Sequence, residues 1–318
     1  MKALITGVAG FIGSSLAERL LLQGHQVVGL DAFLPYYGRK IKEANLAALR
    51  ANKNFAFHET DLLIAPLHRF VDGCEVVFHE AAQAGVRASW GESFEIYTQN
   101  NILATQKLLE SLKGRPVKLI YASSSSVYGE TNKFPMEESD LPQPISPYGV
   151  SKLAAEHLCK LYHAAYKVHT VALRYFTVYG PRQRPDMAFH RFIRALLDGE
   201  SVTVYGDGRQ TRDFTFIDDA VEANLLAAER GQPGSVYNIG GGSRVSIHEV
   251  LKLLKELTGS SSNVVFSERQ RGDVTHTYAS TARARKDLGF SPKVELREGL
   301  RRETEWVRNN LALLKESS

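Results

Sequence analysis

The sequence predicts an α/β fold in which a doubly wound parallel sheet is joined to a smaller C-terminal α/β domain. Short and almost wholly apolar segments recur along the first half of the chain, and longer segments with apolar residues at helical spacing separate them. Strands that are apolar on both faces are typical of a parallel sheet with helices on each side, because only there are both faces buried.

The expected elements begin at the second residue. Strands are expected at 2–6, 25–31, 75–81, 117–123 and 169–175, and helices at 12–24, 92–112 and 147–167. After Tyr179 the pattern loosens into shorter elements, and two later strands, 213–218 and 235–240, are expected to return to the first domain. The sequence therefore predicts a first domain over 1–180, to which the segments near 213–240 return, and a second domain over 181–318.

The composition narrows the possible function classes. The 318 residues carry a net charge of +4 from 39 basic and 35 acidic side chains, which is too little to indicate a nucleic-acid partner. Two cysteines, Cys74 and Cys159, give neither a disulfide framework nor a metal-ligand spacing. The first strand begins at once, leaving no room for a signal peptide, and no apolar run approaches the ~20 residues of a membrane span. We therefore expect a cytoplasmic protein with no metal, membrane or nucleic-acid partner.

A glycine-rich loop, GVAGFIG, lies between the first strand and the first helix, with glycines at 7, 10 and 13. Glycine allows a tight turn and lets the backbone approach a pyrophosphate, whose charge the helix N-terminus stabilises. The next strand ends in Asp31, where a carboxylate can bind the hydroxyls of an adenosine ribose. Asp31 is followed by Ala32 and Phe33, with no adjacent arginine to hold a 2′-phosphate. The sequence therefore predicts a Rossmann-type site for NAD.

Tyr148 and Lys152 lie four residues apart at the start of an expected helix, so both side chains share one face. A tyrosine hydroxyl with its ordinary pKa of ~10 is a poor base at neutral pH. A nearby ammonium and an oxidised nicotinamide would favour the phenolate and lower that pKa. An isolated pair of this spacing is more often a surface pair on an amphipathic helix. Here it follows a dinucleotide site and a strand that ends in four serines, 123–126, so we expect a catalytic pair.

Taken together, these motifs resemble the extended short-chain dehydrogenase/reductases, and most closely their branch of NAD-dependent nucleotide-sugar epimerases and dehydratases. The resemblance covers GxxGxxG at 7–13, EAAQ at 80–83, the serine-bearing strand end and YxxxK at 148–152. It extends from Met1 to about Leu300. Within this branch the chain is most similar to the UDP-glucuronic acid 4-epimerases.

The resemblance implies a role for each matching residue. Tyr148 is expected to be the catalytic base, Lys152 to lower its pKa and hold the nicotinamide ribose, and Ser124 to hydrogen-bond the reacting sugar hydroxyl. The expected cofactor contacts are Gly7, Gly10, Phe11, Ile12, Gly13, Asp31, Lys42, Asp61, Leu62, Ala81, Ala82, Tyr148, Lys152 and Tyr175.

A nucleotide sugar also offers a diphosphate, and a uronate adds a carboxylate, so arginines are expected around it. By similarity, Arg87 and Arg212 face the diphosphate and Arg184 faces the carboxylate. The arginine of the family's RxGD motif is Gln270 here, which leaves Arg269 or Arg271 to substitute. The expected substrate contacts are Arg87, Ser124, Ser125, Ser126, Tyr148, Thr177, Arg184, Arg212 and Arg271.

Ser125 and Ser126 decide between the reactions of this branch. The 4,6-dehydratases carry acidic residues here, and the UDP-glucuronate decarboxylases carry a glutamate at the position of Ser126. Without a carboxylate, deprotonation at C5 and elimination lack their base. The resemblance thus favours C4 epimerisation of UDP-glucuronate to UDP-galacturonate through a 4-keto intermediate, with hydride passing to NAD and back to the opposite face. The alternatives are a UDP-glucose 4-epimerase, a UDP-glucuronate decarboxylase and a catalytically silent NAD-binding sensor.

Two further expectations follow from the resemblance. Ser125, Ser126, Thr177 and Arg184 would hold the sugar carboxylate out of the alignment in which carbon dioxide is lost. Family members also pair as homodimers through two long helices, which correspond here to 92–112 and 147–167.

Overall fold

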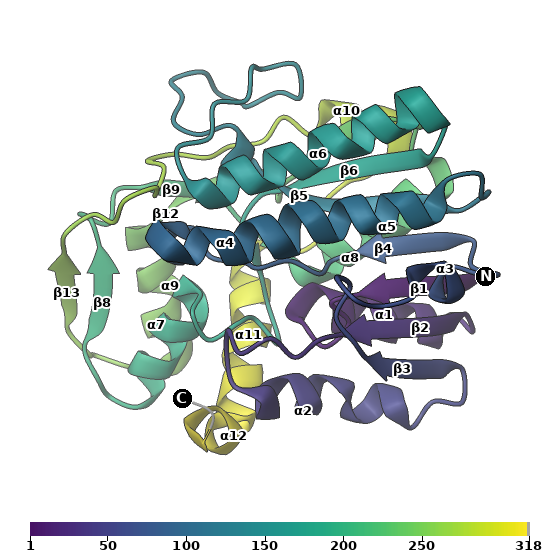
Figure 1. Ribbon diagram of the computed structural model, residues 1–318. Coiled ribbons are helices and arrows are strands. Elements are labelled where there is room, and N and C mark those ends of the chain that lie inside the picture. Colours follow the sequence, from purple (N-terminus) through teal and green to yellow (C-terminus); the bar gives the residue numbers. More distant parts are fainter. Residues whose placement is uncertain (317–318) are drawn as a thin grey trace.

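The computed structural model describes residues 1–316 and is built on a seven-stranded parallel sheet (Figure 1). The strand order is β11-β6-β5-β4-β1-β2-β3. The strands are β1 (Lys2–Thr6), β2 (Gln26–Asp31), β3 (Phe55–Glu59), β4 (Val76–His79), β5 (Lys118–Ser124), β6 (His169–Tyr175) and β11 (Ser235–Ile239). The order reverses between β1 and β4, which is the crevice where doubly wound sheets bind nucleotides. The predicted fold class is confirmed.

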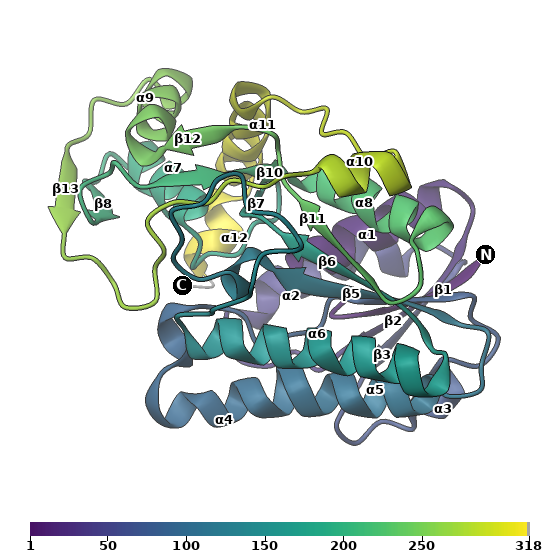
Figure 2. The ribbon, with the colours of Figure 1, turned by 90° about the horizontal axis from the view of Figure 1, so that it is seen from above.

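Both faces of the sheet are buried, as the apolar strands predicted. In β1, Ala3 and Ile5 pack in one core cluster, whereas Leu4 packs in the other, because successive strand residues point to opposite faces. Helices α1 (Phe11–Leu22), α2 (Arg39–Arg50) and α8 (Ile217–Arg230) cover the first face. Helices α3 (Leu67–Phe70), α5 (Ala104–Leu112) and α6 (Pro147–Tyr166) cover the second (Figure 2).

Helix α6 begins at Pro147, as its capping residues indicate. Ser146 is the N-cap, its hydroxyl accepts a hydrogen bond from the Gly149 amide at 3.1 Å, and Pro147 occupies the first helical position. These residues fix the start of the helix, so Tyr148 lies in its first turn, at the carboxyl end of the sheet.

The helix expected at 92–112 is not regular. It consists of α4 (Phe94–Tyr97), a π-helical segment over Thr98–Leu103 and α5. The π-helical segment contains Asn101, whose side chain accepts from the Gln83 amide at 2.7 Å and donates to the Ser151 hydroxyl at 2.9 Å. Asn101 thereby ties this helix to the loop after β4 and to α6.

The sequence analysis missed α2 and β3. Strand β3 is an edge strand with no fully buried residue, so it lacks the continuous apolar pattern that marks the inner strands. In α2 the apolar positions Ile41, Leu46 and Leu49 are buried among charged neighbours, which hides the helical pattern in a polar composition.

The remaining elements gather at the carboxyl ends of the sheet (Figure 1). Three small two-stranded sheets pair β7 (Val178–Tyr179) with β10 (Thr215–Phe216), β9 (Thr211–Asp213) with β12 (Arg244–Ser246), and β8 (Val202–Tyr205) with β13 (Val264–Ser267). The helices here are α7 (Ala188–Leu197), α9 (Ile247–Thr258), α11 (Leu296–Asn309) and α12 (Leu311–Glu316), whereas α10 (Ala282–Leu288) packs against α8 and β11. Over residues 1–316, no helix combines the length and apolar character needed to cross a membrane.

The two later segments expected as strands of the first domain differ in their pairing. Residues 235–239 join the central sheet, as β11 beside β6. Residues 213–216 pair instead in two of the small sheets, and Ile217 begins α8, which covers the central sheet. Asp218 and Asp219 lie in the first turn of that helix, where acidic side chains stabilise the positive end of the helix dipole.

Candidate active site

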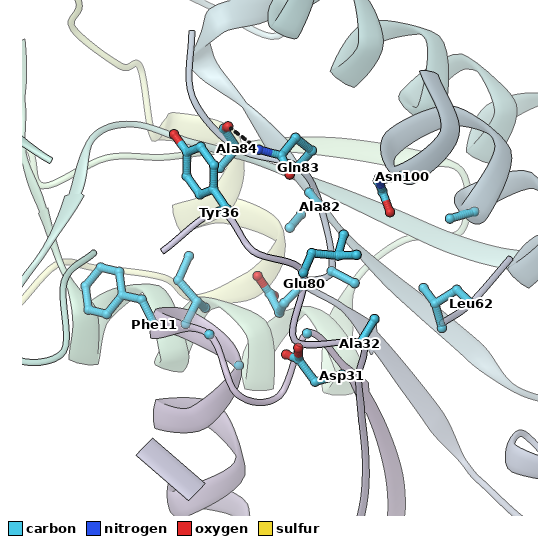
Figure 3. A pocket seen from close by; sticks show the side chains of 18 of the residues that line it. Phe11, Asp31, Ala32, Tyr36, Leu62, Glu80, Ala82, Gln83, Ala84 and Asn100 are labelled. Atoms are coloured by element: carbon cyan, nitrogen blue, oxygen red, sulfur yellow. Dashed lines mark hydrogen bonds between the residues drawn. The ribbon is translucent and has the colours of Figure 1, made fainter. Parts of the chain in front are cut away.

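A cavity lies at the carboxyl ends of the central strands, and every residue predicted to contact the cofactor lines it. Figure 3 shows Asp31, from the end of β2, and Glu80 and Ala82, which follow β4, around the same space. Side chains from α6 and β6 complete the wall with Tyr148, Lys152 and Tyr175. The structure thus brings together segments that lie up to 168 residues apart, from Gly7 to Tyr175.

The glycine loop is shaped by its lack of side chains. Gly7 has a φ of +71°, and a Cβ atom there would lie 2.7 Å from the Ala81 amide nitrogen. A Cβ atom at Gly13 would lie 2.3 Å from the Gly7 carbonyl oxygen. Gly10 caps helix α1, and no side chain hydrogen-bonds to its first amides. The free amides and the positive end of the helix form a site for a pyrophosphate.

Asp31 is fixed from both sides. Its carboxylate accepts the Phe33 amide at 2.8 Å and the Ala9 amide at 3.0 Å, and both oxygens keep further acceptor sites. Burial raises the pKa of this carboxyl, against the hydrogen bonds and the charge of Lys42. Lys42 itself donates to the Leu34 carbonyl at 2.7 Å. The group predicted to hold the adenosine ribose is therefore rigid and faces the cavity.

Ser124, at the end of β5, lies beside the Tyr148 hydroxyl. The Ser124 hydroxyl also accepts the Ser126 amide at 3.1 Å. Burial raises the pKa of the Tyr148 hydroxyl, and the positive charge of Arg184 and the hydrogen bond with Ser124 oppose that rise. Arg184 is therefore a cation that acts on Tyr148, in addition to the predicted Lys152.

Lys152 is buried, with 3% of its surface exposed, and its ammonium lies 4.6 Å from the centre of the Tyr121 ring. Burial lowers its pKa to about 8, and the negative charge of Glu80 opposes this effect. The ammonium is thus held in a site where its charge is only just retained at neutral pH.

A second cavity adjoins the first on the side of the serines. It is lined by Ser125, Ser126, Thr177 and Arg212, together with Asp273 and Val274. The Arg212 guanidinium donates to the carbonyls of Thr211, Val274 and Thr275 at 2.7 to 3.0 Å. Ser124 accepts from the Ser126 amide of the second cavity and acts on Tyr148 of the first, so it lies between the two cavities.

Arg184 lies in the wall of a different cavity from Ser125 and Ser126. It lines the first cavity, and its guanidinium donates two hydrogen bonds of 2.9 Å to Asp186. The Tyr36 hydroxyl donates to the same carboxylate at 3.2 Å. The structure therefore places Arg184 beside Tyr148, and not in the cavity that Ser125, Ser126 and Thr177 share.

The other predicted arginines differ in the residues that they contact and in the cavities that they line. Arg87 donates to Asp273 at 2.7 Å and lies over the Tyr205 ring. Arg269 lines a third cavity beside Arg212 and donates to the Thr275 hydroxyl at 2.7 Å. Arg271 is exposed and lines none of the four described cavities within residues 1–316. The geometry favours Arg269 over the predicted Arg271 as the substitute for the missing family arginine.

The segment that carries Arg184 is anchored from behind by α11. The Gly180 amide donates to Glu303 at 2.9 Å, and the other oxygen of this buried carboxyl has no hydrogen-bond partner among the described residues. Burial raises the pKa of Glu303 well above its ordinary value, which favours the protonated carboxyl.

Several lining residues were not predicted, namely Tyr36, Tyr37, Glu80, Gln83 and Asn100. Glu80 carries a signal in the sequence, because an acid directly after an apolar strand faces the carboxyl edge of the sheet. The tyrosines carry none, since they lie in a loop without a periodic pattern. Residues 1–316 hold no cluster of three or more histidine, cysteine or acidic side chains that could bind a metal.

Comparisons with known proteins agree on one family. The model of the NAD dependent epimerase/dehydratase family matches residues 3–240. The crystal structure of a UDP-glucuronic acid 4-epimerase from Bacillus cereus, in complex with UDP-glucuronic acid and NAD, is 44% identical and superposes with a TM-score of 0.95 over 97% of this chain and 99% of that one.

Two curated relatives also match over nearly the whole length of both chains. A UDP-glucuronate 4-epimerase from Thermodesulfobacterium geofontis is 37% identical over 318 residues, covering 98% of each chain. A Bacillus subtilis protein named as an uncharacterized UDP-glucose epimerase, YtcB, is 42% identical over 312 residues, covering 96% of this chain and 98% of its own length.

Proposed function

Because the chain belongs to the NAD dependent epimerase/dehydratase family, we propose that it interconverts UDP-glucuronate and UDP-galacturonate by epimerisation at C4. The observation that carries the proposal is the pair of serine hydroxyls, Ser125 and Ser126, next to Ser124 and Tyr148. The site offers a base at the reacting hydroxyl and no carboxylate at the two positions where elimination would need one.

The first cavity fits NAD as the resident cofactor. The glycine loop would hold the pyrophosphate against the start of α1, because added Cβ atoms at Gly7 and Gly13 would occupy that approach. The rigid Asp31 carboxylate would accept hydrogen bonds from the adenosine ribose. When bound, NAD supplies an acceptor for the hydride of C4 and returns that hydride later in the cycle.

Tyr148 and Ser124 perform the proton transfer. The Tyr148 phenolate takes the proton of the 4-hydroxyl as the C4 hydrogen leaves with its electron pair, and a 4-keto sugar results. Ser124 keeps the sugar oxygen and Tyr148 within hydrogen-bonding reach. After the keto sugar has rotated to present its opposite face, Tyr148 returns the proton to the new 4-hydroxyl. Atoms and charge therefore balance over the cycle.

The serine hydroxyls protect the intermediate when the substrate is a uronate. Its 4-keto form is a β-keto acid, which loses carbon dioxide when the bond to the carboxylate aligns with the carbonyl π system. Ser125, Ser126 and Thr177 offer hydrogen bonds to the carboxylate from one cavity, and Arg184 offers a positive charge from the other side of Tyr148. We propose that these groups hold the carboxylate out of that alignment.

The direct test is to incubate the purified protein with UDP-glucuronate and to identify the products by chromatography and NMR. UDP-galacturonate is expected as the main product. UDP-xylose as the main product would instead assign a decarboxylase, and the absence of any turnover would favour a silent NAD-binding protein.

A UDP-glucose 4-epimerase is the second candidate, supported by the name of the Bacillus subtilis relative. Comparing turnover of UDP-glucose and UDP-glucuronate in Arg184→Ala distinguishes the two, because an arginine that binds the carboxylate should matter only for the uronate. Arg182→Ala is the matched control, since Arg182 lies in the same loop but pairs with Glu18 at 2.9 Å.

We also propose that the protein is a cytoplasmic homodimer that pairs through the helices α4, α5 and α6. Apolar side chains lie exposed along them, with exposed fractions of 47% at Ile96, 44% at Leu103 and 58% at Leu161. The variant Leu161→Glu should shift the mass measured by light scattering from that of a dimer to that of a monomer. An unchanged mass would place the interface elsewhere.

A further inference from the structure

Glu80 is a charged side chain in the first cavity to which the proposed reaction gives no role. It directly follows strand β4 and is half-buried, and its exposed part faces the cavity (Figure 3). The same cavity wall contains Tyr148, Lys152 and Tyr175. A carboxyl in this position must affect any charge that forms or disappears beside it.

Two buried residues fix the position of Glu80. The Tyr175 hydroxyl lies 3.2 Å from the Glu80 carboxylate and donates to it. The Asn224 amide, 0% exposed, donates in turn to the Tyr175 oxygen at 2.6 Å. This chain leaves the tyrosine hydrogen free for Glu80 and orients the carboxylate without neutralising it.

The main electrostatic partner of Glu80 is Lys152. Burial raises the pKa of Glu80 to about 7, and the Tyr175 hydrogen bond and the Lys152 charge oppose that rise. Burial lowers the pKa of Lys152 to about 8, and the charge of Glu80 is the largest effect opposing it. Each group therefore helps the other to stay charged near neutral pH, and removing one should discharge its partner.

The other titratable groups around the pair cannot replace Glu80. Glu156 on α6 is the only other carboxylate that acts on Lys152 among the described residues, and it forms a buried ion pair with Arg174 at 2.7 Å. The cation Arg184 lies beside Tyr148 in the same cavity and is already paired with Asp186. The remaining titratable neighbours are Tyr121 from β5, Tyr148 and Cys159 from α6, Tyr175 from β6 and His79 from β4, and none of them is a carboxylate that could take the place of Glu80.

We propose that Glu80 is the buried counter-charge of the active site, which keeps Lys152 protonated and favours the oxidised over the reduced form of the bound cofactor. This inference rests on the proposed function, which places the nicotinamide beside Tyr175 and Lys152. An oxidised nicotinamide ring carries a positive charge that it loses on accepting hydride, and a nearby carboxylate stabilises only the charged form. Glu80 would thus keep the cofactor reduced, and the keto sugar exposed to decarboxylation, for only a short part of the cycle.

The test compares holoenzyme with wild-type Glu80, Glu80→Gln and Glu80→Asp. Under saturating UDP-glucuronate, the near-ultraviolet absorbance of the reduced nicotinamide should rise roughly tenfold in Glu80→Gln, the ratio that one pKa unit of lost interaction corresponds to. The alkaline limb of the kcat profile should move to lower pH by roughly one unit or more, because Lys152 loses its proton earlier. Glu80→Asp keeps the charge and should restore both properties in large part.

The controls separate this inference from the proposed function. Glu95→Gln, which removes an acid from the exposed surface of α4, should leave both properties unchanged. If wild-type protein turns over UDP-glucuronate but Glu80→Gln shifts neither property, the inference about Glu80 is wrong and the proposed function stands. If Glu80→Asp behaves like Glu80→Gln, shape and not charge is responsible. If the wild type forms no UDP-galacturonate from UDP-glucuronate, the proposed function fails.

Discussion

The cofactor cavity and the arginine-bearing cavities beside it hold their charged side chains in different ways. In the cofactor cavity the backbone does this work, since Asp31 accepts two amides and Lys42 donates to a carbonyl. Three of the arginines predicted to bind the substrate are instead paired with acids, Arg87 with Asp273, Arg269 with Glu130 and Arg184, in the wall of the cofactor cavity, with Asp186. The fourth, Arg212, donates to backbone carbonyls.

The difference matches what each side is proposed to bind. A cofactor that stays through the whole cycle can be held by a fixed shape, so steric fit at the glycine loop is sufficient. A substrate that enters and leaves brings negative charge and takes it away again, so the arginines need a compensating charge in its absence. Adding a side chain to the glycine loop should therefore weaken NAD binding, whereas changing the acids should alter the affinity for the substrate.

The largest expected effect is on kcat and comes from Tyr148, which is predicted to contact both the cofactor and the substrate. Replacing Tyr148 by phenylalanine removes the base while keeping the ring, so kcat on UDP-glucuronate should fall by roughly 10²- to 10⁴-fold. NAD content and KM should change little, because neither the glycine loop nor the arginines are touched. Steady-state kinetics with the purified variant measures this, and an unchanged kcat would remove Tyr148 from the chemistry.

The next effect tests the fixed shape of the cofactor side. In Gly13→Ala the new Cβ would lie 2.3 Å from the Gly7 carbonyl oxygen, so the loop must move and the pyrophosphate site with it. Strain of this kind costs about 1–3 kcal/mol, and the variant should purify with much less bound NAD. Ser15→Ala on the same helix is the control. Full NAD content in Gly13→Ala would show that the loop tolerates a side chain.

A smaller effect tests the compensating acids. Asp273→Asn keeps the shape of the side chain but frees Arg87 from its ion pair. Because a half-exposed pair of this kind is worth up to about 1 kcal/mol, KM for the UDP-sugar should fall by up to roughly fivefold. Arg87→Ala should raise KM. The same direction of change in both variants would mean that the pair acts as one structural unit.

The smallest effect on activity concerns Glu303, behind the substrate loop. Its folded-state pKa lies above the ordinary value of 4.5, so its contribution to stability is present below that value and is lost as pH rises through the folded pKa. Glu303→Gln stays neutral at every pH and should raise Tm at neutral and alkaline pH, with little change in acid. Thermal unfolding across pH, compared with Glu298→Gln on the exposed face of α11, measures this. An equal shift of Tm at every pH would mean that Glu303 is not held neutral.

Prediction from sequence succeeded where a residue's surroundings are local. The glycine loop, the end of β2 and the start of α6 are each defined by neighbours in the chain, so their presence in one cavity followed from strand order. The partner of an arginine is set by segments far away, as with Arg87 and Asp273, which lie 186 residues apart. For the same reason the sequence could not choose between Arg269 and Arg271, nor separate Arg184 from the serines.

Strand β11 bears on how the protein is made. It completes the central sheet next to β6, yet it is encoded after 59 residues, 176–234, that contribute mainly to the small sheets and to α7 and α8. During synthesis, β6 must therefore remain an unprotected sheet edge until residues 235–239 have left the ribosome, and open edges are prone to aggregation. A fragment that stops at residue 180 should be insoluble. A chaperone that binds the nascent chain should have its largest effect before residues 235–239 have been synthesised.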